Sequence, residues 1–158
     1  MILRLAACLA ALALAACATT DLSQSVKPGM GLDEVLRAAG KPVVEGASWW
    51  DYSRQPWGYY RVEFGADKRV REVRNLHTED NFRKLQKGMS EKEVVDTVGV
   101  TSWIEGSMQG KVSWRYRYRD AGIAKILWVN FGADHRLAWY YWEWDPDVYS
   151  KGGPSDRM

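Results

Sequence analysis

A twelve-residue pattern occurs twice in this chain, at residues 29–40 and again at residues 88–99. Both copies begin with Gly-Met, carry Glu-Val in the middle and end in Gly, so five of the twelve positions are identical. A second block, Phe-Gly-Ala-Asp-x-Arg, recurs downstream in the same order, starting at Phe64 and at Phe131. Two matched blocks in register indicate an internal duplication, so each copy is expected to form its own structural unit.

The amino terminus has the pattern of a secretory signal peptide. Arg4 precedes an apolar run at residues 5–16, which is shorter than the roughly 20 residues that span a bilayer. The run ends in Leu-Ala-Ala-Cys, and this motif resembles the lipobox of bacterial lipoproteins. The resemblance implies that residues 1–16 are removed by cleavage between Ala16 and Cys17. Cys17 would then carry a diacylglycerol and a further acyl chain such as palmitate.

The residue after the cysteine bears on location. It is Ala18 rather than Asp, which in related lipoproteins favours the outer membrane. We therefore expect a lipid anchor in the outer membrane of a Gram-negative bacterium, a periplasm-facing fold, and a lipidated tether at residues 17–25. A motif ending in Cys8 fits the same pattern with a shorter apolar run. A cleaved signal or a membrane anchor helix without lipid stays open as an alternative.

The charge balance argues against a nucleic-acid-binding protein, and the cysteine content argues against a disulfide-stabilised one. Cleavage would remove one of the 22 basic residues and none of the 20 acidic ones, which leaves a net charge near +1. Such a balance gives no electrostatic footprint for nucleic acid, so no nucleic-acid partner is expected. Only Cys8 and Cys17 are present, so the mature fold has to rest on its core without disulfides.

The repeated pattern itself predicts a short helix in each copy. Ser90 followed by Glu93 fits a capping box, and Gly99 is the residue type that ends helices. The first copy keeps the acid at Glu34 and the terminator at Gly40. Helices of about two turns are marginal alone, so they must pack on another element.

That other element is predicted to be a sheet of three antiparallel strands in each copy. Alternating apolar and polar residues indicate strands, after which the hairpin block Phe-Gly-Ala-Asp returns the chain. The predicted ranges are 48–53, 58–64 and 69–74 in the first copy, and 112–118, 124–131 and 136–142 in the second. The predicted fold class is α+β, with two tandem repeats at residues 26–76 and 85–144, a linker at 77–84 and a flexible tail at 145–158.

The Gly-Met-x-x-x-Glu-Val pattern ending in Gly, followed by three antiparallel strands, resembles the SmpA/OmlA (BamE-like) family of outer-membrane lipoproteins. The resemblance covers roughly residues 26–142, and it implies an accessory role in the assembly of outer-membrane β-barrel proteins. Two copies in tandem are similar to the arrangement in β-lactamase-inhibitory proteins. This chain departs from the family pattern at Gly31, which replaces a hydroxyl residue, and at Thr101, which replaces a proline.

The sequence does not assemble a catalytic or metal-binding set. Its two histidines, His77 and His135, fall in the predicted linker and in a hairpin loop, and neither has ligand residues at a recognisable spacing. Glu34 and Glu93 are interpreted as capping residues because they follow the Gly-Met turn at the capping-box spacing. We therefore expect a non-enzymatic protein without cofactors or metals.

Aromatic residues are the candidates for binding, because Trp and Tyr dominate interaction hot spots. Strict alternation would place half of them in the cores and leave the other half for a binding face, for single exposed rings, or for packing between the repeats. On strand 112–119 the rings share one face and the arginines the other. The candidate surface residues are Trp49, Tyr59, Trp114, Tyr116, Tyr118, Trp128, Trp139 and Tyr141.

Three functions fit such a surface. The first is a periplasmic scaffold that binds a periplasmic or outer-membrane protein during envelope or β-barrel assembly. The second is an inhibitor-type binder of a periplasmic enzyme. The third is a binder of glycan such as peptidoglycan, in which aromatic rings would stack on sugars while Glu63, Asn130 or Glu143 fix hydroxyl groups. The oligomeric state stays open.

Overall fold

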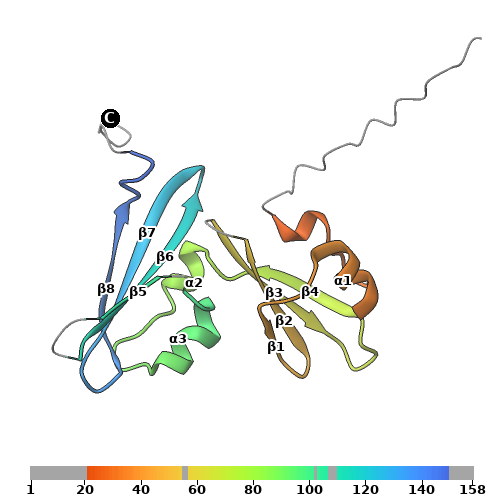
Figure 1. Cartoon of the computed structure of the whole chain (residues 1–158), viewed down its shortest axis with the longest axis horizontal. Coiled ribbons are helices and arrows are strands. Elements are labelled where there is room, and N and C mark those ends of the chain that lie inside the picture. The colour runs from red at the N-terminus through yellow and green to blue at the C-terminus, as the bar shows by residue number, and fades with distance from the viewer. Residues whose placement is uncertain (1–20, 55–56, 102, 107–109, 150–158) are drawn as a thin grey trace, which may run out of the picture.

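The computed structural model describes residues 21–54, 57–101, 103–106 and 110–149 (Figure 1). The elements of repeat 1 are η1 (Leu22–Gln24), α1 (Leu32–Ala39), β1 (Val44–Glu45), β2 (Trp49–Arg54), β3 (Gly58–Phe64) and β4 (Val70–Asn75). Those of repeat 2 are α2 (Glu79–Phe82), α3 (Glu91–Val98), β5 (Trp103–Gly106), β6 (Val112–Asp120), β7 (Ile123–Phe131) and β8 (Leu137–Trp144).

The two sheets are antiparallel meanders with strand orders β1-β2-β3-β4 and β5-β6-β7-β8. They confirm the predicted α+β fold with tandem units. The prediction of three strands per sheet is wrong, since each sheet has a fourth strand that precedes the other three. β1 has two residues and β5 has four, all of them exposed in β5, so neither carries the alternating pattern by which strands are recognised.

The Gly-Met turns join each helix to the last strand of its own sheet. The backbone N–H of Gly29 donates to the Val70 carbonyl at 2.8 Å, and Val70 N–H donates to the Met30 carbonyl at 2.8 Å. Gly88 and Met89 bond to Leu137 in the same way, at 2.8 and 2.7 Å. The two sequence blocks that revealed the duplication are therefore one hydrogen-bonded unit, present twice.

The helix ends follow from local chemistry. Ser90 N–H donates to Glu93 Oε2 at 2.8 Å, while Ser90 Oγ accepts from Glu93 N–H at 3.3 Å. Glu34 makes only the first of these bonds, to Gly31 N–H at 2.7 Å, because Gly31 has no side chain to return the other. Gly40 and Gly99 end the helices with φ of 78° and 82°, in a region that side chains other than glycine rarely adopt.

Each helix packs on one face of its own sheet. In repeat 1 the core contains Val35, Tyr52, Val62 and Phe64, and in repeat 2 it contains the equivalent apolar residues of α3, β6 and β7. Because η1 contributes the buried Leu22 to the core of repeat 1, part of the predicted tether at 17–25 belongs to the fold.

The predicted tail also begins inside the fold. Asp145 is buried and its carboxylate pairs with Arg117 at 2.6 Å, while the Tyr149 hydroxyl accepts from Ala124 N–H at 3.1 Å. The prediction of a flexible segment from residue 145 is therefore wrong for residues 145–149. The sequence signal was misleading because Pro146 and the charged residues suggested a loop, whereas an ion pair holds the segment.

The repeats stack head to tail, with α2 and α3 between the two sheets (Figure 1). The face of sheet 1 that points away from α1 is covered by the end of α3. Arg61 pairs with Asp51 at 2.8 and 2.9 Å on this face, and its Nη1 donates to the Asp96 carbonyl of α3 at 3.2 Å. Tyr59 packs against Gly99, where a Cβ atom would lie 2.3 Å from the Tyr59 ring.

His77 completes this contact between the repeats. Its ring stacks on Tyr59 at 5.4 Å and meets Tyr116 edge-on at 5.4 Å, and it is almost completely buried. Neither ring nitrogen has a hydrogen-bond partner among the described residues. Burial therefore lowers the pKa of His77 to about 3.

Acidification is expected to weaken the fold through His77. The pKa in the folded chain lies below the ordinary value of 6.5, so the unfolded chain binds more protons between pH 6.5 and about 3. Stability should fall across that window as pH falls, by up to about 1.4 kcal/mol per pH unit from this group alone. Urea unfolding at several pH values, compared with His77→Phe, measures it. A pH slope that His77→Phe leaves unchanged would contradict this assignment.

Candidate functional site

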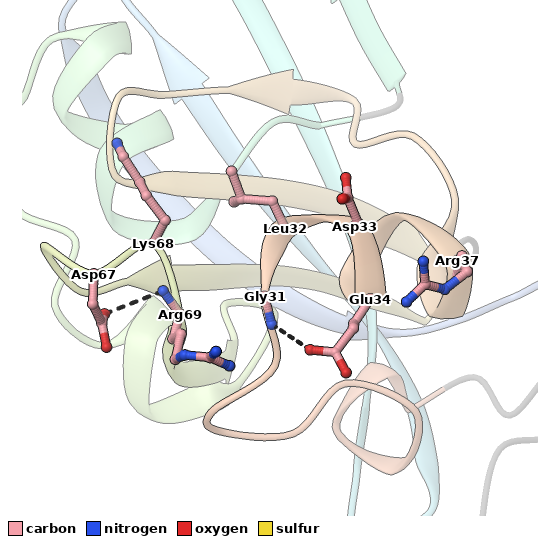
Figure 2. A pocket seen from close by; sticks show the side chains of 8 residues that line it. All are labelled: Gly31, Leu32, Asp33, Glu34, Arg37, Asp67, Lys68 and Arg69. Atoms are coloured by element: carbon pink, nitrogen blue, oxygen red, sulfur yellow. Dashed lines mark hydrogen bonds between the residues drawn. The ribbon is translucent and has the colours of Figure 1, made fainter.

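The most voluminous of the surface hollows we describe, near 480 Å³, lies at the amino end of α1 (Figure 2). Charged side chains line it, but three of them serve the repeat motif. Glu34 caps the helix at Gly31, Asp67 Oδ1 accepts from the Arg69 backbone at 3.2 Å, and the Arg69 guanidinium donates to the Gly29 carbonyl at 2.8 Å. These three charged side chains therefore have structural roles in the repeat motif, and we do not take this hollow as the candidate binding site.

A more distinctive surface lies on the face of sheet 2 that points away from α3. Five side chains form a row across all four strands, which we call the aromatic row: Trp139, Tyr141, Trp128, Arg115 and Trp103. Trp139 stacks on Tyr141 at 5.3 Å, and Tyr141 on Trp128 at 6.5 Å. The Arg115 guanidinium lies 5.9 Å from the Trp128 ring and 4.5 Å from the Trp103 ring.

The aromatic row is accessible and its rings are held in place. Trp139 is 56% exposed, Trp103 48% and Tyr141 39%. Carboxylates at the rim accept from two of the indole N–H groups, Glu143 from Trp128 at 2.6 Å and Glu105 from Trp103 at 2.9 Å. Because stacking and these bonds restrict the rings before a partner arrives, binding would lose less side-chain entropy.

The row ends where other parts of the chain cover sheet 2. Toward the far end of β6, Arg117 pairs with Asp145, and the Trp57 ring lies 5.1 Å from Arg117 and 4.5 Å from Arg119. At the opposite end, next to Trp139, a groove of about 420 Å³ opens. It is lined by Glu105, Gly106, Lys111, Ser113, Asn130, Phe131, Gly132, Ala138 and Trp139.

Of the eight predicted surface residues, Trp128, Trp139 and Tyr141 lie in this row. Trp114, Tyr116 and Tyr118 are buried in the core of repeat 2, and Tyr59 is buried between the repeats, so none of these four is available to a partner. Trp49 is half-buried, with the Arg61 guanidinium 4.3 Å from its ring.

The physical reason for the correction is the orientation of β6. Its Trp and Tyr rings point toward α2 and α3, and its Arg side chains point to the open face. The Tyr116 hydroxyl donates to the Gly99 carbonyl at 3.2 Å, as Tyr52 does to Gly40 at 3.3 Å in repeat 1. Alternation showed that β6 has two different faces, but both are rich in large side chains. It could not show which face meets the helices.

Sequence reasoning missed Trp103 and Arg115. Trp103 stands in the unpredicted strand β5, and Arg115 was assigned to a polar face. The alternating arginines of β6, interleaved with aromatic residues on the neighbouring strands, were the available signal for Arg115. Trp103 gave no signal because its strand is too short to show a period.

Repeat 1 provides an internal comparison for this face. The strand registers pair Glu63 with Glu72 and Asn130 with Trp139, so Glu72 and Trp139 occupy the same place in the two sheets. Arg74 likewise corresponds to Tyr141. In repeat 1 these positions are charged, and Glu63 forms ion pairs with both Arg71 and Arg74. The same fold thus presents solvated charges in one copy and aromatic rings in the other.

Two predicted features cannot be located on this surface. Ala16 and Cys17, the predicted cleavage and lipidation residues, lie outside the described residues. Within the described ranges, no helix is long and apolar enough to cross a membrane. Among those same residues, no cluster of three or more His, Cys, Asp and Glu side chains is arranged to hold a metal ion.

No protein-family model and no curated protein matches the sequence. The solved structures that are similar in part include the following two. A putative osmotically inducible lipoprotein, OsmE, is 19% identical, and the match covers 46% of this chain and 85% of that one with a TM-score of 0.39. A DUF4309 family protein, YjgB of Bacillus subtilis, is 18% identical, over 79% of this chain and 86% of that one, with a TM-score of 0.31. Because these identities and TM-scores are low, we argue the function of this chain from its own residues and their geometry.

Proposed function

We propose that this chain is a lipid-anchored, non-enzymatic module of the outer membrane that binds a protein partner in the periplasm through its aromatic row. The anchor follows from the lipobox-like motif at Cys17. Within that frame we propose a scaffold role in envelope or β-barrel assembly, which is supported by the resemblance of both repeats to the SmpA/OmlA (BamE-like) family.

The observation that carries this proposal is the contrast between the two copies. Where repeat 1 places Glu72 and Arg74 in water, repeat 2 places Trp139 and Tyr141. The fold therefore does not require rings at these positions. An exposed group of large aromatic side chains is unfavourable in water and is typical of interaction sites.

The composition of the row suits a protein interface. Trp, Tyr and Arg are the residue types that contribute most to hot spots, and here they are contiguous and partly ordered. Burial beside the neighbouring rings, together with Glu143 and Glu105, raises the pKa of Tyr141. The Tyr141 hydroxyl is protonated at neutral pH, as it is for an ordinary tyrosine, and the raised pKa extends the protonated range to higher pH.

A second candidate, glycan binding, is favoured by the groove beside Trp139. Ser113 Oγ bonds to Asn130 Oδ1 at 2.7 Å there, and the Asn130 amide nitrogen has no partner among the described residues. A ring beside an amide, a hydroxyl and the charges of Glu105 and Lys111 could hold a sugar. Protein binding is preferred because the row extends over four strands, far beyond this groove.

Transplanting the residues of repeat 1 tests the proposal. In the double variant Trp139→Glu, Tyr141→Arg, the fold should persist because repeat 1 already tolerates these residues. Recovery of β-barrel-assembly components with the lipidated protein in mild detergent should fall about tenfold or more, since hot-spot residues are lost. Circular dichroism and thermal unfolding verify that the variant is folded.

The matched control is Glu72→Ala, Arg74→Ala on repeat 1, which should leave recovery unchanged. Equal recovery with the wild type and the transplanted variant would exclude the aromatic row as the binding site. Failure to recover any assembly component from the wild type would overturn the scaffold role. Co-sedimentation with purified peptidoglycan, lost on Trp139→Ala, would support the glycan candidate.

A further inference from the structure

The strand β8 forms the outer edge of sheet 2 (Figure 1). Hydrogen-bond alternation shows which of its backbone groups are free, that is, point away from β7 and have no partner among the described residues. Asp145 N–H, just after β8, donates to the Ala124 carbonyl of β7 at 3.1 Å. In antiparallel pairs every second residue faces its neighbour strand, so Glu143 and Tyr141 also bond to β7. The backbone N–H and C=O groups of Tyr140, Trp142 and Trp144 therefore point away from the sheet.

Among the described residues, this edge has less protection than the equivalent edge of repeat 1. β4 carries Arg71, Glu72 and Arg74, and Asn81 covers its end by donating to the Asn75 and Leu76 carbonyls at 3.3 and 3.2 Å. Charges and covering groups are the usual means of blocking edge-to-edge pairing. β8 has the sequence Leu-Ala-Trp-Tyr-Tyr-Trp-Glu-Trp, with a single charge and eight residues in length.

A hollow lies directly beside this free edge. It has a volume of about 420 Å³ and is lined by Trp142, Trp144, Glu143, Lys125 and Glu79. The Lys125 ammonium is paired with Glu79 at 3.0 Å and with Asp120 at 2.6 Å, so the positive charge at its wall is already neutralised. Trp142 and Trp144 supply the apolar part of the wall, so the hollow suits an apolar or aromatic side chain better than an anionic one.

We propose that β8 binds an extended, amphipathic segment of a partner protein, which adds to sheet 2 as a fifth strand. Only a polypeptide backbone offers alternating donors and acceptors at the spacing of the free groups of Tyr140, Trp142 and Trp144. An apolar or aromatic side chain of that segment fills the hollow beside Trp144. The site is the edge of the sheet rather than its aromatic row, so it stands or falls separately from the proposed scaffold surface.

The test uses the full-length protein in detergent and a fluorescent synthetic peptide as long as β8, alternating aromatic and polar residues. Binding is measured by fluorescence anisotropy. A second peptide of the same sequence, N-methylated at alternate residues, keeps the side chains but cannot donate along one edge. It should bind about tenfold more weakly or worse, because several backbone hydrogen bonds are lost together.

Two variants separate the backbone from the side chain at Trp144. Because its N–H points outward, Trp144→Pro removes an edge donor without breaking a bond to β7, whereas Trp144→Thr keeps the donor. Trp144→Pro should bind the peptide about tenfold more weakly than Trp144→Thr. Glu72→Ala, on the exposed edge strand of repeat 1, should leave peptide affinity unchanged.

Equal affinity for the plain and N-methylated peptides would overturn the proposal without relying on any protein variant. A dimer in light scattering that Trp144→Pro dissociates and Trp144→Thr preserves would also overturn it, since the edge would then pair with a second copy of this chain.

Discussion

Replacing Arg61 with alanine is expected to destabilise the protein by about 3–5 kcal/mol, because it leaves the buried carboxylate of Asp51 without a charged partner. Asp51 is almost fully buried, and Arg61 meets it with two hydrogen bonds of 2.8 and 2.9 Å. The same guanidinium bonds to the Asp96 carbonyl at the end of α3, where a cation is also favoured by the helix dipole. One substitution thus leaves a charge unpaired and removes a bond between the repeats. Urea unfolding of the purified protein measures the loss.

The control for Arg61 lies on the same sheet. Arg74 also pairs with a glutamate, but its side chain is exposed, and surface ion pairs contribute about 0–1 kcal/mol. Arg74→Ala should therefore be nearly neutral. The double variant Asp51→Leu, Arg61→Met should recover much of the stability, since it removes both charges together. Similar losses for Arg61→Ala and Arg74→Ala would contradict the prediction that the buried Asp51 carboxylate makes the loss of Arg61 costly.

Gly99→Ala is expected to destabilise the protein by about 2–6 kcal/mol, because two penalties combine at one residue. Its φ of 82° and ψ of −177° lie in a region that costs a non-glycine residue on the order of 1–3 kcal/mol. In addition, the new Cβ would lie 2.3 Å from Cδ1 of the Tyr59 ring, so the ring or α3 has to move. Overpacking of this kind typically adds about 1–3 kcal/mol. Thermal unfolding monitored by tryptophan fluorescence gives the comparison.

The duplication supplies the matched control for Gly99. Gly40 ends α1 with φ of 78°, yet a Cβ there would meet no atom within 4 Å. Gly40→Ala should therefore show the backbone penalty alone, and the difference between the two variants isolates the Tyr59 contact. Adding Tyr59→Ala to Gly99→Ala should then cost less than the two single effects combined. If Gly40→Ala were as damaging as Gly99→Ala, the close approach of Tyr59 would contribute nothing.

The parts of the fold that could be predicted are those with local causes. Ser90, Glu93 and Gly99 determine the ends of α3 through hydrogen bonds and backbone conformation within a few residues. The repeated Gly-Met turns indicate where each repeat begins. The alternation of apolar and polar residue types in β7 likewise shows in the sequence itself which side chains share a face. Such features need no knowledge of distant contacts, so the sequence pattern was sufficient for the α+β architecture.

The candidate site depended on contacts between distant segments and was predicted only in part. Trp128, Trp139 and Tyr141 fall in the aromatic row, but Trp114, Tyr116 and Tyr118 form the core instead. Both sets are aromatic and alternate with period two, and only the position of α3 distinguishes them. The same limit applies to Tyr59, which would be an exposed ring in an isolated repeat and is buried only because repeat 2 packs over it.

That stacking has an evolutionary consequence. On the outward face of the first sheet, Tyr59 packs against Gly99 and Arg61 bonds to Asp96. Substitutions on that face and at the end of α3 therefore constrain one another. On the second sheet, no other repeat among the described residues packs over the equivalent aromatic row. The row is therefore under no such constraint, and it carries rings where the first sheet carries ion pairs. In this chain, one face of repeat 1 is therefore used for contact between the repeats, whereas the equivalent face of repeat 2 is available for a partner.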